Sequence, residues 1–157
     1  DTFSKTYIMT GFRIGWCVAN KDLIRTMDIF QQNSVTNVPA FVQLAALAAI
    51  TGPQDHVEVI TKKLEGKRDR TVAALNKMPG VECPTPDGSF YVFPDIRGTG
   101  MTAQQFADHM IENHQVGVVA GSAFGDRGEG HIRLTYACPD DVLEEGLDRI
   151  RQGVENL

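Results

Sequence analysis

The chain has 157 residues, of which 42% are hydrophobic and 22% charged, and its formal net charge is −5. This composition is typical of a globular protein and excludes disordered, collagen-like and low-complexity chains. The scattered Lys and Arg residues form no basic stripe of the kind that nucleic-acid-binding proteins carry. No apolar run approaches the ~18 residues of a membrane helix. We therefore expect neither a nucleic-acid partner nor a membrane span.

The first elements predicted along the chain are one strand and two helices. Residues 14–19 form a short apolar run with aromatic and β-branched members, which predicts a buried strand. Asn20 is a suitable N-cap for a helix over residues 21–32, whose apolar residues recur at helical spacing. Pro39 suits the start of a second helix over residues 40–50, which is apolar nearly all round and predicts burial on several sides.

A long helical pattern covers residues 54–78, with a very polar centre that contains Gly66. A helix with a charged centre often runs between two packing units, and glycine weakens its middle. We place a domain boundary along it, so that residues 1–55 form one domain and residues 56–157 a second.

The second domain is predicted to mix short strands with two helices. Thr102 and Gln105 have the spacing of a capping box, and Pro139 precedes an acidic first turn. The order of elements is typical of a compact α+β unit. We expect strands at 81–83, 89–93, 117–120 and 131–137, and helices at 103–114 and 139–156.

Three cysteines, Cys17, Cys83 and Cys138, are widely spaced along the chain. An odd number at such spacing matches neither a disulfide framework nor a metal site. We interpret them as buried free thiols, which together with the ordinary composition suggests a cytosolic protein.

Lys5 and Arg13 stand close together in sequence among hydroxyl residues and glycines. A lysine amine is nucleophilic only when neutral, and a neighbouring positive charge favours the neutral form. Arginine also binds phosphate through two parallel hydrogen bonds. With the hydroxyl groups of Thr2, Ser4 and Thr6, the segment holds the groups of a phosphate-plus-carbonyl site. A surface lysine and an ion-paired arginine are the alternative interpretation.

The segment SKTYIMTGFRIG (residues 4–15) resembles the lysine segment of class I and II aminotransferases, the pyridoxal-phosphate enzymes of fold type I. Their pattern is a small hydroxyl residue, the lysine and, several residues on, Gly-x-Arg-aliphatic-Gly. The resemblance implies pyridoxal 5′-phosphate as cofactor, Lys5 as the catalytic residue that binds it covalently, and Arg13 as its phosphate ligand. It implies Thr2 and Ser4 as further cofactor contacts, with Thr2 where the family usually has Ser or Gly.

Other segments resemble the same family, in the family's order. Residues 37–43 look like the loop and helix near its dimer interface, and residues 88–94 (GSFYVFP) like the first strands of its small domain. Residues 119–125 (VAGSAFG) look like a loop that usually reads Pro-Gly-x-x-Phe-Gly, with Ala120 in place of the proline. Several motifs in order are a far more specific signal than one alone.

Residues 131–137 (HIRLTYA) resemble the strand whose arginine binds the α-carboxylate of the substrate, which implies Arg133. The residue types alone point the same way, because an unpaired charge among apolar residues is costly and a carboxylate would relieve that cost. A salt bridge to one of the chain's many acidic residues is the alternative.

The remaining candidates receive structural interpretations. Arg97 and Arg127 flank glycines in loops, where either could reach a substrate side chain, but we interpret both as solvated. His131 is interpreted as structural or solvated, and Trp16 and Tyr91 as core residues.

The resemblance covers nearly the whole chain and implies an α/β to α+β fold. It implies the end of a fold type I large domain, followed by a small C-terminal α+β domain with a mostly antiparallel sheet flanked by helices. It further implies an aminotransferase that moves an amino group between an amino acid and a 2-oxo acid. The enzyme would be a cytosolic homodimer of amino-acid metabolism and biosynthesis, with no metal.

The family places the acidic partner of the cofactor ring and the aromatic residue stacked on it upstream of the lysine. We therefore expect residues 1–157 to be the C-terminal segment of a longer enzyme and to be inactive alone. Three alternatives remain open: a pyridoxal-phosphate lyase of the same fold, an aminotransferase-like sensor domain of a transcriptional regulator, and a dimerising module. The identity of the amino acid substrate does not follow from these motifs.

Overall fold

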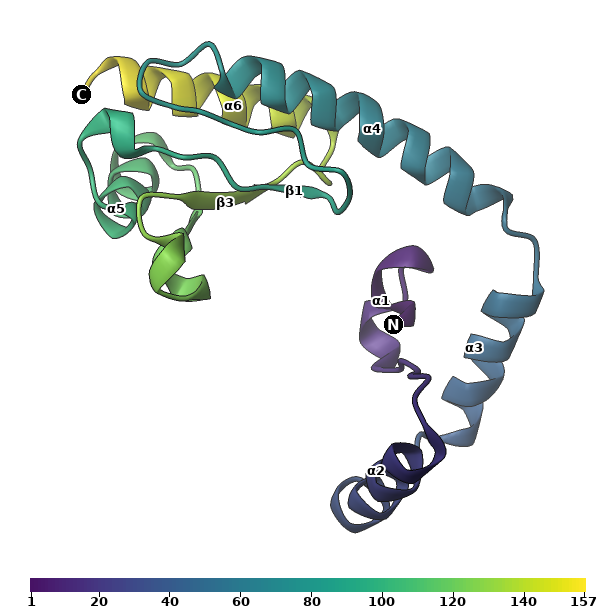
Figure 1. The fold of residues 1–157 in the computed structure, drawn as a ribbon. Helices are drawn as coiled ribbons and strands as arrows, with labels where there is room; N and C mark the ends of the chain where they lie inside the picture. Colours follow the sequence, from purple (N-terminus) through teal and green to yellow (C-terminus); the bar gives the residue numbers. More distant parts are fainter. The chain divides into compact units, whose positions relative to one another are not determined.

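The computed structural model describes all 157 residues (Figure 1). The chain divides into two compact units, Asp1–Ile60 and Thr61–Leu157. The long helix α4 (Asp55–Leu75) begins in the first unit and ends in the second. None of the helices is both long and apolar enough to cross a membrane.

The first unit consists of helices joined by a paired N-terminal segment. It contains α1 (Phe3–Thr6), a 3-10 turn at Thr10–Phe12, α2 (Lys21–Ser34) and α3 (Ala40–Thr51). The predicted helices over residues 21–32 and 40–50 are confirmed. The predicted cap of α2 is also confirmed, since the Asn20 side chain accepts a hydrogen bond of 2.9 Å from the Leu23 N–H.

The buried strand predicted over residues 14–19 is wrong. Only a single bridge forms there, between Thr2 and Gly15. Trp16 is 50% exposed and Val18 85% exposed, so Trp16 is not a core residue either. The apolar pattern indicates a preference for burial. A strand also needs neighbouring strands that satisfy its backbone N–H and C=O groups. In this unit only residues 1–3 pair with residues 14–16.

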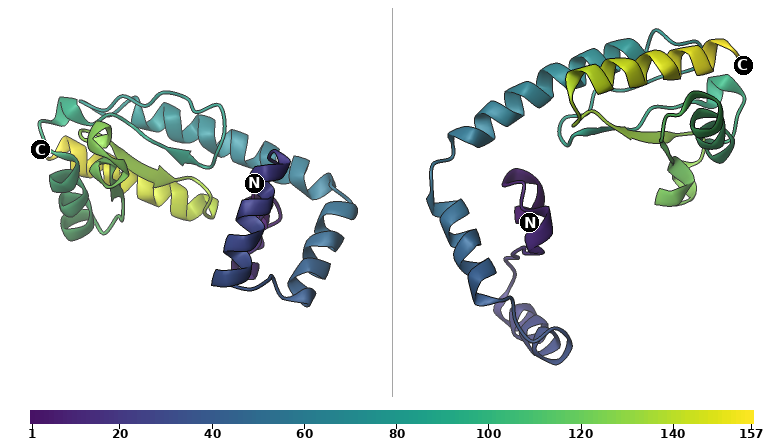
Figure 2. Two further views of the ribbon diagram at one scale, coloured as in Figure 1. Left: turned by 60° about the horizontal axis from the view of Figure 1, so that its bottom comes forward. Right: turned by 180° about the vertical axis from the view of Figure 1, so that it is seen from behind.

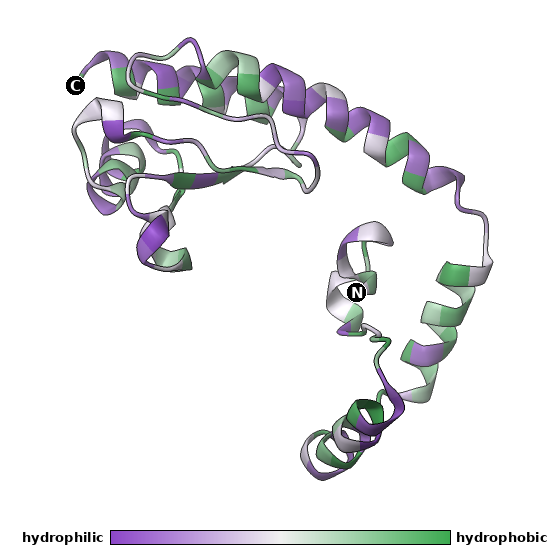
Figure 3. Cartoon of the chain, viewed as in Figure 1, coloured by the Kyte–Doolittle hydropathy of each residue, from purple (hydrophilic) through white to green (hydrophobic).

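The first unit covers little of its apolar surface. Its core is the cluster of Phe3, Met9 and Ala46, with a few half-buried neighbours. The expectation that α3 would be buried on several sides is therefore wrong, because Val42 and Ala46 are its only buried residues. No residue of α2 is buried. Figure 3 shows apolar stretches along both helices.

The second unit is built on a small antiparallel sheet, as expected for the α+β domain. Its strands are β1 (Tyr91–Val92), β2 (Val119–Ala120) and β3 (Ile132–Thr135). They lie in the order β1-β3-β2, with Tyr91 opposite Thr135 and Val119 opposite Arg133. The last strand in sequence is thus central in the sheet.

The predicted strands are shorter than their sequence patterns. The strand expected at residues 81–83 is a single bridge between Glu82 and Asp95, whose N–H groups donate to each other's carbonyl oxygens at 2.9 and 2.8 Å. Pro94 directly precedes Asp95, and Pro84 comes two residues after Glu82. Proline has no N–H to donate, so neither ladder continues past it.

Helices α5 (Ala103–His114) and α6 (Asp140–Glu155) complete the second unit. Figures 1 and 2 show α6 beside the C-terminal half of α4 on one face of the sheet. The predicted capping box of α5 is confirmed, with bonds from the Gln105 N–H to Thr102 Oγ1 (3.2 Å) and from the Thr102 N–H to Gln105 Oε1 (3.0 Å). The core of this unit includes Leu75, Val92, Phe106, Met110, Ile132, Tyr136 and Ile150.

Candidate functional site

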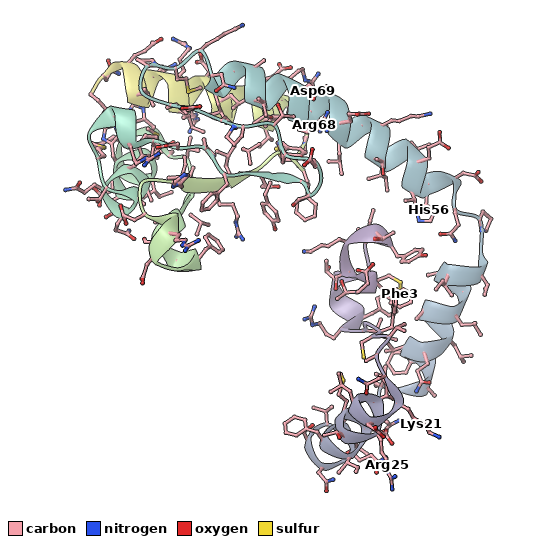
Figure 4. All side chains as sticks on the ribbon, viewed as in Figure 1. Phe3, Lys21, Arg25, His56, Arg68 and Asp69 are labelled. Carbon is pink, nitrogen blue, oxygen red and sulfur yellow. The ribbon has the colours of Figure 1, made fainter.

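Lys5 is held by a short helix that its neighbours anchor. The exposed lysine lies on α1, two residues after the buried Phe3, which belongs to one cluster with Ala46 of α3. Figure 4 labels Phe3. Phe3 also stacks on Tyr7, with ring centroids 5.3 Å apart. The Tyr7 hydroxyl donates to Gln54 Oε1, in the connection between α3 and α4, over 3.1 Å, so residues on both sides of Lys5 are held by other parts of the unit.

Backbone pairing closes residues 1–16 into a single loop that carries Lys5 and Arg13. The Trp16 N–H donates to the Asp1 carbonyl oxygen over 2.8 Å, and the Phe3 N–H to the Ile14 carbonyl oxygen over 3.2 Å. This pairing requires a glycine at position 15, because a Cβ there would lie 2.8 Å from the Asp1 carbonyl oxygen.

Arg13 has a left-handed backbone with φ of 52°, and its Nη1 donates to the Thr10 carbonyl oxygen over 3.0 Å. The guanidinium is exposed. Ile8 is also left-handed, at φ of 55°. For a β-branched residue this conformation costs on the order of 1–3 kcal/mol, and such strain gathers at functional sites.

The side chains of this loop fit a phosphate and an aldehyde. The Lys5 amine can condense with a carbonyl group, and the exposed Arg13 guanidinium can bind a phosphate. Thr2 is exposed and Ser4 half-buried, and each adds a hydroxyl donor. The loop therefore has the chemistry of the donor set that pyridoxal 5′-phosphate needs.

Arg133 lies in the second unit, on the central strand β3, and is half-buried. Its Cζ is 4.5 Å from the centroid of the Tyr91 ring and 4.4 Å from that of Phe124. The guanidinium makes no ion pair or hydrogen bond with another residue of the chain. The salt bridge considered from the sequence is therefore absent, and the guanidinium contacts two aromatic rings instead.

The aromatic surroundings of Arg133 are the part of the site that the sequence interpretation missed. Tyr91 is half-buried beneath the guanidinium, so its interpretation as a core residue is wrong. Phe124 contacts Phe93 edge-on at 6.0 Å, and Phe93 stacks on His131 at 5.3 Å. Strand alternation could have found Tyr91, because residues two apart share a face of the sheet.

Arg97 forms an ion pair with Asp95. Its Nε donates to Asp95 Oδ1 and Oδ2 over 3.0 and 2.8 Å, and its Nη2 also contacts the carboxylate. The bonds from Arg97 lower the pKa of Asp95 below its usual range. Arg127 is exposed on a 3-10 turn at Asp126–Gly128, as its interpretation as a solvated residue requires.

The cysteines are free, as predicted, but only Cys83 is buried. Cys17 is exposed and Cys138 half-buried, so the expectation of three buried thiols is wrong. Burial raises the pKa of Cys83 to about 11. No cluster of three or more His, Cys, Asp or Glu residues could hold a metal ion.

An apolar groove of about 350 Å³ lies elsewhere in the second unit. Its walls come from residues 115–117, the end of β3 and α6, and include Leu134, Val142 and Leu147. None of the predicted site residues lines it.

Comparison with known proteins identifies one family. Residues 1–150 match the sequence model of the family described as aminotransferase class I and II. The chain is 38% identical to an aspartate aminotransferase of Pyrococcus horikoshii over 99% of the chain and 40% of that protein. It is 40% identical to an aspartate/prephenate aminotransferase of Cereibacter sphaeroides over 94% of the chain and 39% of that protein.

Solved structures agree with the sequence matches. The crystal structure of an aromatic aminotransferase from Pyrococcus horikoshii matches with a TM-score of 0.94 and 38% identity, over 99% of this chain and 42% of that one. An aspartate aminotransferase from Rhizobium meliloti matches with a TM-score of 0.91 and 32% identity, over 98% and 40%. The chain thus spans about 40% of the length of the relatives that it matches.

Proposed function

The chain belongs to the aminotransferase class I and II family, and from this premise we propose that it acts in a pyridoxal-phosphate-dependent aminotransferase. Such an enzyme moves an amino group between an amino acid and a 2-oxo acid. The observation that carries the proposal is the pair of donor sets described above. One is a loop with an amine, a guanidinium and hydroxyls, and the other is a half-buried arginine that lacks an acidic partner.

Each predicted site residue has a role in this proposal. Lys5 would hold the cofactor covalently until the amino acid displaces it, and the freed Nζ amine would then take the proton from the α-carbon of the amino acid and return it to the cofactor side of the transferred nitrogen. Arg13 binds the cofactor phosphate, with Thr2 and Ser4 as hydroxyl donors. Arg133 binds the α-carboxylate of the amino acid. Pyridoxal phosphate supplies the electron sink that makes the α-proton acidic.

We assign residues 1–55 to the large cofactor-binding domain of this enzyme and residues 56–157 to its small domain. Homodimerisation, a cytosolic location and a place in amino-acid biosynthesis stay predictions. Relatives of similar identity carry names that refer to aspartate, to aromatic amino acids and to arginine with pyruvate. Similarity at this level therefore selects no substrate side chain.

Cofactor attachment gives the first test. The complete gene product that contains this chain is incubated with pyridoxal 5′-phosphate, reduced with borohydride and digested, and mass spectrometry locates the pyridoxyl group. We expect the label on Lys5, and none in a Lys5→Ala variant that retains its circular dichroism spectrum. A label on another lysine would contradict the assignment.

Product analysis separates the aminotransferase from its alternatives. An aminotransferase gives a new 2-oxo acid and a new amino acid in equal amounts, whereas a lyase releases ammonia or an eliminated group. A sensor domain would bind the cofactor without turnover and would be joined to a DNA-binding region. We expect residues 1–157 alone to give no product, and turnover by this chain would contradict that expectation.

A further inference from the structure

We propose that Tyr91 and Phe124 are positioning residues that hold the Arg133 guanidinium ready for a carboxylate. The inference rests on the proposed role of Arg133 and deepens it. Its starting observation is that two aromatic rings lie within 4.5 Å of Arg133 Cζ while no side chain of the chain bonds to the guanidinium.

A guanidinium contacts hydrogen-bond acceptors and aromatic rings through different parts of its surface. Its five N–H groups lie in the plane of the group and point outward from its edge. Aromatic rings contact its flat faces instead. Tyr91 and Phe124 can therefore fix the side chain of Arg133 while every N–H stays available. A carboxylate of the chain in their place would occupy the same N–H groups that a substrate needs.

Two acidic side chains of neighbouring segments are engaged elsewhere. Asp95 is bound by Arg97 at 2.8 Å, and Glu129 Oε1 accepts a hydrogen bond of 2.8 Å from the Ala103 N–H. These pairings keep both carboxylates from neutralising Arg133. Stabilisation by the rings compensates part of the cost of leaving a half-buried cation without a counter-charge.

Phe124 can act in this way because its loop is fixed. It ends the 3-10 turn Gly121–Phe124, in which the Gly121 N–H donates to the His131 carbonyl oxygen over 2.8 Å. A Cβ at Gly121 would overlap the carbonyl oxygen of Gly128, so the two backbones touch. The edge-on contact with Phe93 supports the ring from the side.

Steady-state kinetics of the complete gene product, loaded with pyridoxal phosphate, test the inference. Tyr91→Leu and Phe124→Leu remove a ring but keep apolar bulk. We expect each to raise KM for the amino acid by about 2- to 30-fold, the range that cation–π contacts span, with kcat changed by less than about twofold. Tyr91→Phe keeps the ring and should retain the original KM. Phe30→Leu, at an exposed phenylalanine of α2, is the matched control.

The outcomes distinguish the inference from the function on which it rests. If Arg133→Gln raises KM and both leucine variants leave it unchanged, the positioning role is wrong and the role of Arg133 stands. An Arg133→Gln variant with unaltered KM overturns both. A Tyr91→Phe variant that behaves like Tyr91→Leu shows that the hydroxyl matters rather than the ring, which also overturns the inference. The absorbance of the bound cofactor and the thermal midpoint show that each variant is folded and loaded.

Discussion

At the scale of single residues, the pair formed by Asp95 and Arg97 makes a pH-dependent contribution to stability. Arg97 lowers the pKa of the Asp95 carboxyl, so the folded state binds a proton there less readily than the unfolded chain. The stabilisation is therefore present above the ordinary aspartate pKa of about 3.9 and is lost as the pH falls through the folded value.

We expect Asp95→Asn to lower the free energy of unfolding near neutral pH, and we expect its difference from the original chain to shrink as the pH falls below the ordinary aspartate pKa. Urea denaturation between pH 7 and pH 3 measures the difference. Asp87→Asn, at an exposed aspartate, is the control and should show no such convergence. A difference that grows on acidification would contradict the sign.

Cys83 illustrates how burial removes reactivity. Its side chain lies in the core of the second unit, and its pKa of about 11 leaves almost no thiolate at pH 8. We expect iodoacetamide to leave Cys83 unmodified in native buffer and to label it fully in urea. Mass spectrometry of the tryptic peptide follows both reactions, and rapid labelling of the native protein would show that the thiol is accessible.

At the scale of elements, α5 depends on its capping box. Thr102 and Gln105 satisfy each other's backbone N–H groups, which would otherwise lack partners within the helix. Thr102→Ala is expected to destabilise the protein by about 1 kcal/mol, measured from the urea midpoint. Thr85→Ala, at an exposed threonine outside the helices and strands, should cost much less. Equal effects of the two variants would mean that the cap contributes nothing.

Local signals explain which elements could be predicted from the sequence. Helix limits followed from caps such as Asn20 and Thr102, since a cap acts within a few residues of its own position. The strand at residues 14–19 could not be excluded in the same way, because a strand depends on partners that its own pattern does not specify. Tyr91 and Phe124 lie more than thirty positions apart in the sequence, so their joint contact with Arg133 was visible only in the structure.

At the scale of the whole chain, the two units bury their helices to different degrees. No residue of α2 is buried, whereas α6 buries Leu143, Ile150, Gly153 and Val154. A helix of this length is marginal in water without tertiary packing. The resemblance identified the family correctly, but it did not show how little apolar surface the first unit covers by itself.

Hydrogen exchange of the 157-residue chain should reveal this difference. We expect the amides of α2 to exchange much faster than those of α6, because opening α2 exposes no buried side chain. Mass spectrometry of peptides from the two helices compares them within one sample, so that each serves as a control for the other. Similar protection of both helices would contradict the prediction.

The order of strands has a consequence for how the protein is made. Because β3 lies between β1 and β2, neither outer strand has a partner in the sheet until residues 132–135 have been synthesised. Most of the second unit is therefore synthesised before its sheet can form. β1 stays without a strand partner until β3, about forty positions downstream, has been made. The strand that completes the sheet also carries Arg133, so the proposed carboxylate site comes into existence in the same step as the fold that supports it.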